Sequence, residues 1–177
     1  MVANYNNNVV SYTYEGTKNL NGTKTFNSGN EAIDSFVTKG NLRAHAKAPG
    51  NAVTVLLDED NEQKLVGYVT IVTHTLSREM LSSVKENVGK TPTIPIVKLN
   101  MLGVSLDYQK QGFGEALMRI ALSNTKKVIG VAGCAGLYLE AAPEAISFYE
   151  KLGFVGLSPP DTKTGIQPMF LHANLIP

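Results

Sequence analysis

Residues Gly103 to Gly114 read Gly-Val-Ser-Leu-Asp-Tyr-Gln-Lys-Gln-Gly-Phe-Gly, and the rest of the chain is organised around this stretch. An apolar run, Ile94 to Val104, leads into it, and an amphipathic helical pattern follows it. A strand that turns into a helix through Gly112 directs several unpaired backbone N–H groups toward one point, at the positive end of the helix dipole. The stretch is therefore predicted to cradle an anion such as a pyrophosphate.

The glycine spacing in this stretch matches neither of two common phosphate-binding signatures. The chain has no Gly-x-Gly-x-x-Gly here, and no Gly-Lys-Ser/Thr follows the turn. The pattern that remains, Gln-x-x-Gly-x-Gly from Gln109 to Gly114, resembles motif A of the GCN5-related N-acetyltransferases (GNAT family). In that family motif A holds the pyrophosphate of acetyl-CoA. A strand-to-helix turn that only needs small residues is the alternative explanation for the glycines.

Composition places the chain among ordinary globular proteins. Its 177 residues are 43% hydrophobic, which suits one domain with a substantial core. The net charge is +1, from 16 Lys and Arg against 15 Asp and Glu, so no global charge indicates nucleic-acid or membrane binding. Cys134 is the single cysteine, which excludes an internal disulfide. Because the three histidines are also widely spaced, no metal site is predicted.

Two absences in the sequence predict a cytoplasmic protein. No apolar run approaches the roughly 20 residues that a membrane span needs. The first residues, Met1 to Asn8, lack the basic segment followed by an apolar one that marks a secretory signal. We therefore expect a protein that is neither secreted nor inserted in a membrane.

Hydrophobic periodicity and turn residues predict the order of strands and helices. The predicted elements are strand 9–14, helices 30–37 and 41–47, strands 52–57 and 65–75, helix 77–87, strand 96–104, helix 112–127, strand 136–141, helix 143–152, and strands 154–155 and 169–171. This order predicts a single α/β (α+β) domain with a central mixed, mostly antiparallel sheet and helices on both faces. Residues 1–25 form a polar, asparagine-rich segment with the first strand, and residues 26–177 form the expected GNAT-like domain.

A second stretch strengthens the resemblance to the GNAT family. Gly136 to Phe154 reads Gly-Leu-Tyr-Leu-Glu-Ala-Ala-Pro-Glu-Ala-Ile-Ser-Phe-Tyr-Glu-Lys-Leu-Gly-Phe, which resembles motif B, a strand followed by a helix that ends in Phe-Tyr-Glu-x-x-Gly-Phe. The resemblance implies an acyltransferase with acetyl-CoA as cosubstrate. It also implies that Tyr149 is catalytic and that Phe148 lines the cofactor site, although packing in the core explains Phe148 equally well.

The opening of the domain resembles one subfamily in particular. Phe26-Asn-Ser-Gly-Asn-Glu-Ala-Ile-Asp-Ser-Phe-Val is similar to the Phe-Asp-Cys-Gly-Asn opening of GNAT toxins of the TacT and AtaT type, and the similarity extends over residues 26–172. It implies acetylation of the amino group of aminoacyl-tRNA, which blocks translation, and restraint by a ribbon-helix-helix antitoxin. A homodimer is a further candidate assembly. Asn27, Ser28, Ser105 and Lys110 depart from the subfamily pattern.

The sequence offers few cationic side chains for a tRNA. The second predicted helix carries Arg43 and Lys47, where such toxins usually have several arginines. Between residues 98 and 127, five basic side chains stand against two acidic ones. The basic residues are Lys98, Lys110, Arg119, Lys126 and Lys127, and the acidic ones are Asp107 and Glu115. We expect this modest patch, with Arg43 and Lys47, to bind a polyanionic acceptor.

Direct acetyl transfer assigns roles to the predicted site residues. Backbone N–H groups near Leu102 to Val104 can polarise the thioester carbonyl, most simply if Gly103 permits a bulge that frees a donor. The Tyr149 phenol, with an ordinary pKa near 10, can give its proton to the departing sulfur. The cofactor-binding residues predicted from the cradle and from the resemblance are Leu102, Gly103, Val104, Gln109, Lys110, Gln111, Gly112, Phe113, Gly114 and Phe148.

The nature of the acceptor follows from a missing carboxylate. No Asp or Glu lies in residues 96–104, where many GNAT enzymes place a general base, and Glu140 is the only near candidate. An α-amino group has a pKa near 7.7 to 8.0 and a lysine one near 10.4, so an enzyme without a strong base favours an α-amine. The alternatives are a small amine or protein as acceptor, or a catalytically idle domain that binds acetyl-CoA.

Overall fold

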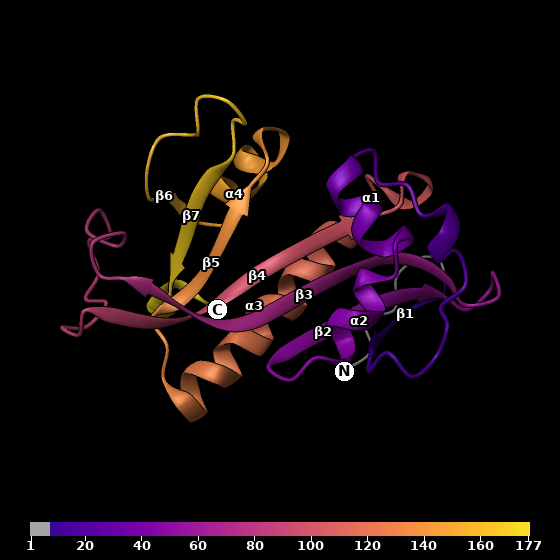
Figure 1. Cartoon of the computed structure of the whole chain (residues 1–177), viewed down its shortest axis with the longest axis horizontal. Helices are drawn as coiled ribbons and strands as arrows, with labels where there is room; N and C mark the ends of the chain where they lie inside the picture. The colour runs from indigo at the N-terminus through magenta and orange to yellow at the C-terminus, as the bar shows by residue number, and fades with distance from the viewer. Residues whose placement is uncertain (1–7) are drawn as a thin grey trace. The chain divides into compact units, whose positions relative to one another are not determined.

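The computed structural model describes residues 8–177, and its elements follow the predicted order with one exception (Figure 1). Residues 1–7 of the predicted asparagine-rich segment lie outside the described residues. The strands are β1 (Val9–Thr13), β2 (Asn51–Asp58), β3 (Lys64–Ser77), β4 (Thr93–Val104), β5 (Gly136–Ala141), β6 (Val155–Gly156) and β7 (Gln167–His172). The α-helices are α1 (Glu31–Thr38), α2 (Asn41–Lys47), α3 (Phe113–Ala132) and α4 (Ile146–Lys151).

Seven strands form one mixed sheet in the order β1-β2-β3-β4-β5-β7-β6. β1 runs antiparallel to β2, with Val9 opposite Asp58. β5 and β6 each run antiparallel to β7, whereas β4 and β5 are parallel and pair Val97 with Leu137. The predicted mixed, mostly antiparallel sheet is confirmed.

The chain divides into two compact units, and β3 and β4 contribute to both of them. The first unit combines the described residues up to Ile71 with Met101–Ala121, so it holds α1, α2 and the turn that follows β4. The second unit combines Val72–Asn100 with Leu122–Pro177, so it holds β5, α4, β6 and β7.

Helices cover both faces of the sheet in the first unit. Side chains alternate along a strand, so Gly67 and Tyr68 of β3 point to opposite faces. On one face the Tyr68 hydroxyl donates to the Ile33 carbonyl of α1 at 2.9 Å. On the other face a Cβ added to Gly67 would lie 3.2 Å from the Leu117 side chain of α3. The sheet is thus sandwiched between α1 and the first half of α3.

Helix α1 forms where two local signals agree. Asn30 precedes it in an extended conformation, and its side chain accepts hydrogen bonds from the N–H groups of Ala32 and Ile33. The apolar positions Phe36 and Val37 then fall on the inner face, where Phe36 stacks on Tyr68 with ring centroids 6.0 Å apart. The predicted start of this helix is confirmed.

The predicted helix over residues 77–87 is wrong. β3 runs to Ser77, and the N–H groups of Met80 and Leu81 then bond to carbonyls three residues back, as in successive turns. Leu81 is 1% exposed and packs in a core cluster with Tyr138 and Phe170. Burial of this leucine in the second unit therefore outweighs a weak local preference for helix.

Helix α3 also extends beyond its predicted end at Lys127. It runs to Ala132, and Gly133 closes it in the left-handed region (φ 69°) with its N–H bonded to the Ile129 carbonyl at 3.2 Å. Lys126 and Lys127 therefore lie more than a turn before the helix end. No helix within residues 8–177 is both long and apolar enough to span a membrane.

Candidate functional site

The stretch from β4 to α3 turns the chain through two left-handed residues. After β4 ends at Val104, a 3-10 turn covers Leu106–Tyr108, and α3 begins at Phe113. Lys110 (φ 60°) and Gly112 (φ 85°) have left-handed backbones between them. Such alternation makes successive N–H groups point to one side, and the first N–H groups of a helix have no partner within that helix. We call residues 109–114 the cradle.

Side-chain and backbone hydrogen bonds fix the shape of the cradle. The Gln109 amide nitrogen donates to the Ser28 carbonyl at 2.7 Å and to the Val104 carbonyl at 3.0 Å. The Leu106 N–H donates to the Asn27 carbonyl at 2.8 Å. The cradle is therefore tied both to the end of β4 and to the loop that precedes α1.

The glycines of this region serve different needs. A Cβ added to Gly103 would collide with the Ile33 side chain, so close packing of α1 on β4 explains that glycine. Gly112 is explained by its positive φ of 85°, a backbone conformation that residues with a side chain rarely adopt. Gly114 has neither constraint, because it lies in α3 with an ordinary helical φ and an added Cβ would meet nothing within 4 Å. Gly112 and Gly114 thus leave open space in which a ligand can approach the backbone.

The charges around the cradle favour an anion. Asp107 pairs with Lys64 at 3.2 Å and Glu115 with Arg119 at 3.8 Å, so both nearby carboxylates have a cationic partner. Lys110 is exposed and forms no ion pair with any described residue. The Lys110 ammonium group is therefore available to a bound anion.

The predicted donors at Leu102, Gly103 and Val104 lie at the end of β4. The Ser105 N–H donates to the Val66 carbonyl at 2.8 Å, as expected between neighbouring strands. The Met101 N–H donates instead to the buried Thr70 hydroxyl at 3.1 Å. The bond to a side chain shows that the pattern of backbone pairing is irregular at this point of β4. That Leu102 to Val104 supply the polarising N–H group stays a prediction.

Tyr149 lies on α4 in the second unit and is 7% exposed. Its ring contacts Phe148 and Phe154, with centroids 5.2 and 5.6 Å away, and burial raises the pKa of its phenol to about 12. Its hydroxyl has no hydrogen-bond partner within residues 8–177. The other described tyrosines each donate to an oxygen: Tyr12, Tyr14, Tyr68, Tyr108 and Tyr138. The Tyr149 hydroxyl is not among the fully enclosed polar atoms of the described chain, so a buried ring presents an accessible hydroxyl, which is consistent with a bond to substrate.

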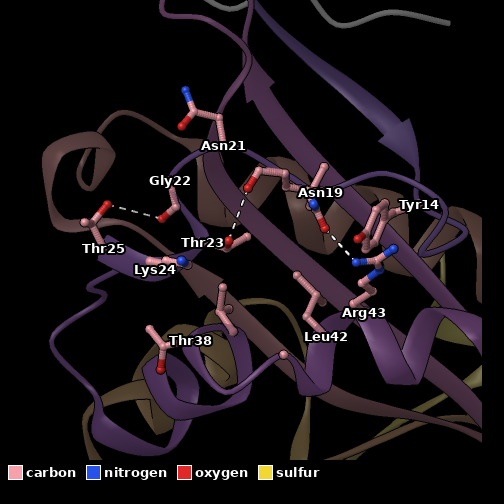
Figure 2. A pocket seen from close by; sticks show the side chains of 13 residues that line it. Tyr14, Asn19, Asn21, Gly22, Thr23, Lys24, Thr25, Thr38, Leu42 and Arg43 are labelled. Carbon is pink, nitrogen blue, oxygen red and sulfur yellow. Dashed lines mark hydrogen bonds between the residues drawn. The ribbon is translucent and has the colours of Figure 1, made fainter.

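Arg43 of α2 lines a pocket of about 530 Å³ in the first unit (Figure 2). Its guanidinium donates to the Gly16 carbonyl at 2.9 Å and to the Asn19 side chain at 2.6 Å. Lys24 lines the same pocket, and no Asp or Glu does. Lys47 is exposed, but its aliphatic stem lies where a Cβ on Gly16 would be. Arg43 therefore holds the loop after β1 in addition to presenting charge.

Glu140, the carboxylate nearest to a base position, is already engaged. Its carboxylate accepts a hydrogen bond from Lys98 at 2.8 Å and a longer one from the Tyr138 hydroxyl at 3.4 Å. The Lys98 ammonium also lies 5.6 Å from the centre of the Tyr138 ring. No local sequence pattern indicates this pair, because its partners are 42 residues apart. No cluster of His, Cys, Asp or Glu in the described chain suits a metal ion.

Comparison with known proteins identifies the sequence pattern and the fold. A family model described as "Acetyltransferase (GNAT) domain" matches residues 49–156. A crystal structure described as a bacterial toxin is 34% identical, with 95% of this chain and 92% of that chain covered and a TM-score of 0.88. No curated protein matches the chain significantly.

Two further structures share the fold at lower identity. One is AtaT complexed with acetyl-methionyl-tRNAfMet, at 23% identity, 94% and 95% coverage and a TM-score of 0.79. The other is a tyrosine-to-phenylalanine mutant of the AtaT toxin bound to acetyl-CoA and to the C-terminus of the antitoxin AtaR, at 23% identity, 95% coverage of both chains and a TM-score of 0.74.

Proposed function

The chain belongs to the GNAT acetyltransferase family and is an acetyl-CoA-dependent N-acetyltransferase, and we propose that its acceptor is the α-amino group of aminoacyl-tRNA. Such a reaction would block translation, as a toxin does, because an acetylated α-amino group cannot form a peptide bond. The observation that carries it is the ion pair of Glu140 with Lys98 at 2.8 Å, which leaves the one candidate base near the central strand already engaged.

The cradle is the proposed binding site for the pyrophosphate of acetyl-CoA. The open space at Gly112 and Gly114, the N–H groups at the start of α3 and the free Lys110 ammonium all favour a doubly charged anion. Gly112→Asp places a carboxylate in this space at a left-handed residue. We expect it to abolish acetyl-CoA binding in calorimetry, and an unchanged affinity would contradict the assignment.

The chemical step joins the acceptor nitrogen to the thioester carbon and breaks the carbon–sulfur bond. Backbone N–H groups at Leu102 to Val104 polarise the carbonyl oxygen, and the Tyr149 hydroxyl donates to the developing thiolate. Burial of Tyr149 favours this role, because a phenol with a pKa of about 12 stays protonated at any physiological pH. The proton lost by the attacking amine leaves to water.

An α-amine fits a site without a free carboxylate. At neutral pH a useful fraction of α-amino groups is already uncharged, since their pKa lies near 7.7 to 8.0, whereas a lysine near 10.4 needs a base. The attached ester of an aminoacyl-tRNA makes the amine still less basic. The structure of AtaT with acetyl-methionyl-tRNAfMet gives a precedent on the same fold.

A tRNA acceptor also requires cations outside the cradle. We place its backbone along Arg43, Lys24 and Lys47 of the first unit, with the patch between residues 98 and 127 as a second contact. Each phosphate contacted adds about 0.7 to 0.9 to the slope of log affinity against log salt. Arg43→Ala should therefore lower the slope by about one contact, and a tRNA affinity that does not vary with salt would favour a small amine or a protein acceptor.

The proposed partners and location follow from the same family. The AtaT–AtaR complex supports an antitoxin as a partner of this chain, and the resemblance to such toxins implies the ribbon-helix-helix type. A homodimer remains part of the proposal. A cytoplasmic location suits an enzyme that uses acetyl-CoA and aminoacyl-tRNA.

Mass spectrometry of total aminoacyl-tRNA, incubated with the protein and acetyl-CoA, tests the proposal directly. We expect a mass increase of one acetyl group on the aminoacyl moiety, and none with the Tyr149→Phe variant over the same time. Acetylated polyamines or proteins with unmodified aminoacyl-tRNA would identify another acceptor class. Acetyl-CoA binding without any acetylated product would identify an idle binding domain.

A further inference from the structure

We propose that the hydrogen bond between Tyr108 and Asp58 is a positioning device that sets the cradle for acetyl-CoA. Tyr108 is the last residue of the 3-10 turn before the cradle, and Asp58 is the last residue of β2. Neither residue belongs to the Gln-x-x-Gly-x-Gly pattern of residues 109–114, and neither is expected to touch the cosubstrate. The inference rests on the proposed binding of the pyrophosphate at the cradle.

The bond is short, buried and supported on both sides. The Tyr108 hydroxyl donates to Asp58 Oδ2 at 2.7 Å, and both residues are 7% exposed. The other carboxylate oxygen accepts the Asp60 N–H at 3.1 Å, and the Asn61 amide donates to the Tyr108 hydroxyl at 3.4 Å. These bonds attach the β2–β3 turn, which includes Glu62 in a left-handed conformation (φ 50°), to Tyr108, the residue that directly precedes the cradle.

Tyr108 transmits this attachment to the cradle in two ways. It directly precedes Gln109, whose side chain fixes the opposite side of the turn. Its ring also packs against Phe113, the first residue of α3, with centroids 6.2 Å apart. A parallel link joins Asp107 to Lys64 of β3, whose ammonium lies 5.9 Å from the centre of the Tyr108 ring. The N–H groups of the cradle are thus held between the hydrogen bonds of the Gln109 side chain and the Tyr108–Asp58 bond.

A purely structural role explains less well than a positioning role why a tyrosine and an aspartate occupy these buried positions. A buried carboxylate carries a desolvation cost, and apolar side chains of similar volume often stabilise a core at least as much. A hydroxyl–carboxylate bond adds direction, because it fixes both the distance and the angle of the ring. Orientation matters most where backbone donors must converge on one ligand.

The expected effect is on affinity for acetyl-CoA. Without the hydroxyl, the turn samples arrangements in which its N–H groups do not converge, and the apparent Kd equals the intrinsic Kd divided by the competent fraction. A fall of that fraction to between about 0.1 and 0.2 raises the Kd about 5- to 10-fold. A ligand without the pyrophosphate should not be affected.

Calorimetric titration with acetyl-CoA and with S-acetylpantetheine, which lacks the pyrophosphate, tests the proposal on the full chain. Tyr108→Phe is the main variant, and Tyr12→Phe is the matched control. The Tyr12 hydroxyl also donates to a carboxylate, Glu59 at 2.6 Å, but at an exposed position outside the cradle. Asp58→Asn, which keeps the acceptor shape without the charge, serves if Tyr108→Phe does not fold, and it should give a smaller increase in the same direction.

The proposal expects a 5- to 10-fold higher Kd for acetyl-CoA in Tyr108→Phe, with an unchanged response to S-acetylpantetheine, an unchanged kcat at saturating acetyl-CoA and no effect in Tyr12→Phe. A lower melting temperature with an unchanged Kd would overturn it and leave the bond a structural one. Gly112→Asp distinguishes the two levels of inference. If that variant binds acetyl-CoA normally, the cradle itself is misassigned. If it loses binding while Tyr108→Phe keeps the parent affinity, only the positioning role fails.

Discussion

Replacing Tyr149 with phenylalanine separates chemistry from folding, because the hydroxyl has no partner in the described chain. The ring keeps its contacts with Phe148 and Phe154, and no hydrogen bond within residues 8–177 is broken. We therefore expect the free energy of unfolding to stay within about 1 kcal/mol of the parent value. The Kd for acetyl-CoA should also be unchanged.

The loss in rate follows from the pKa of the phenol. Burial raises the pKa of Tyr149 to about 12, whereas an alkyl thiol has a pKa near 8.5. The phenol is thus the weaker acid, and it acts mainly by hydrogen bonding to the sulfur while negative charge develops there. General acids contribute about 10²- to 10⁴-fold, and we expect the lower half of that range, about 10²- to 10³-fold or roughly 3 to 4 kcal/mol.

Single-turnover acetylation and urea unfolding of the same samples measure the two effects separately. Tyr14→Phe is the control with the opposite expectation, because the Tyr14 hydroxyl donates to the Lys18 carbonyl at 2.7 Å. Its loss should lower stability by about 1 kcal/mol and leave the rate intact. A parent-like rate in Tyr149→Phe would refute the reasoning and remove the Tyr149 hydroxyl from the mechanism.

Three further changes test the structure at other points. Gly114→Ala should raise stability by about 0.5 to 1 kcal/mol, because alanine is the better helix former, yet weaken acetyl-CoA binding in calorimetry by filling the open space. Gly103→Ala should lower the free energy of unfolding in urea by about 1 to 3 kcal/mol, because its methyl group meets Ile33. Burial lowers the pKa of His45, so the unfolded chain takes up a proton first as pH falls below about 6.5, and stability is lost in that direction. His45→Gln should flatten the decline in stability between pH 7 and pH 5, and an equally steep decline would show that His45 is not its source.

The sequence predicted elements well where several local signals agreed. Asn30 supplied a cap just before apolar residues at helical spacing, and α1 begins there. The predicted bounds of α2 and β5 are those observed. The segment after Ser77 carried a helical spacing alone, and the burial of Leu81 decided its conformation instead.

Long-range contacts account for what the sequence did not show at the candidate site. The basic character of Arg43 was evident, but its bonds to Gly16 and Asn19 join residues 27 and 24 positions apart. The same holds for the Tyr108–Asp58 bond, whose residues lie 50 positions apart. Such pairings arise from strand order and register, which a local pattern does not specify.

The cradle shows why one short pattern carries so much information. Its glutamine and its two glycines meet three separate physical requirements: Gln109 ties the turn to Ser28 and Val104, Gly112 adopts a left-handed backbone, and Gly114 leaves room outside the helix. The first two follow from hydrogen bonds and backbone conformation within the chain, whereas no described residue lies close enough to explain the third. Free space alone does not mark a ligand site, because Gly130 near the end of the same helix has it as well. At Gly114 the free space lies in the first turn of α3, next to the left-handed Gly112, and this position is why Gly114 supports acetyl-CoA binding.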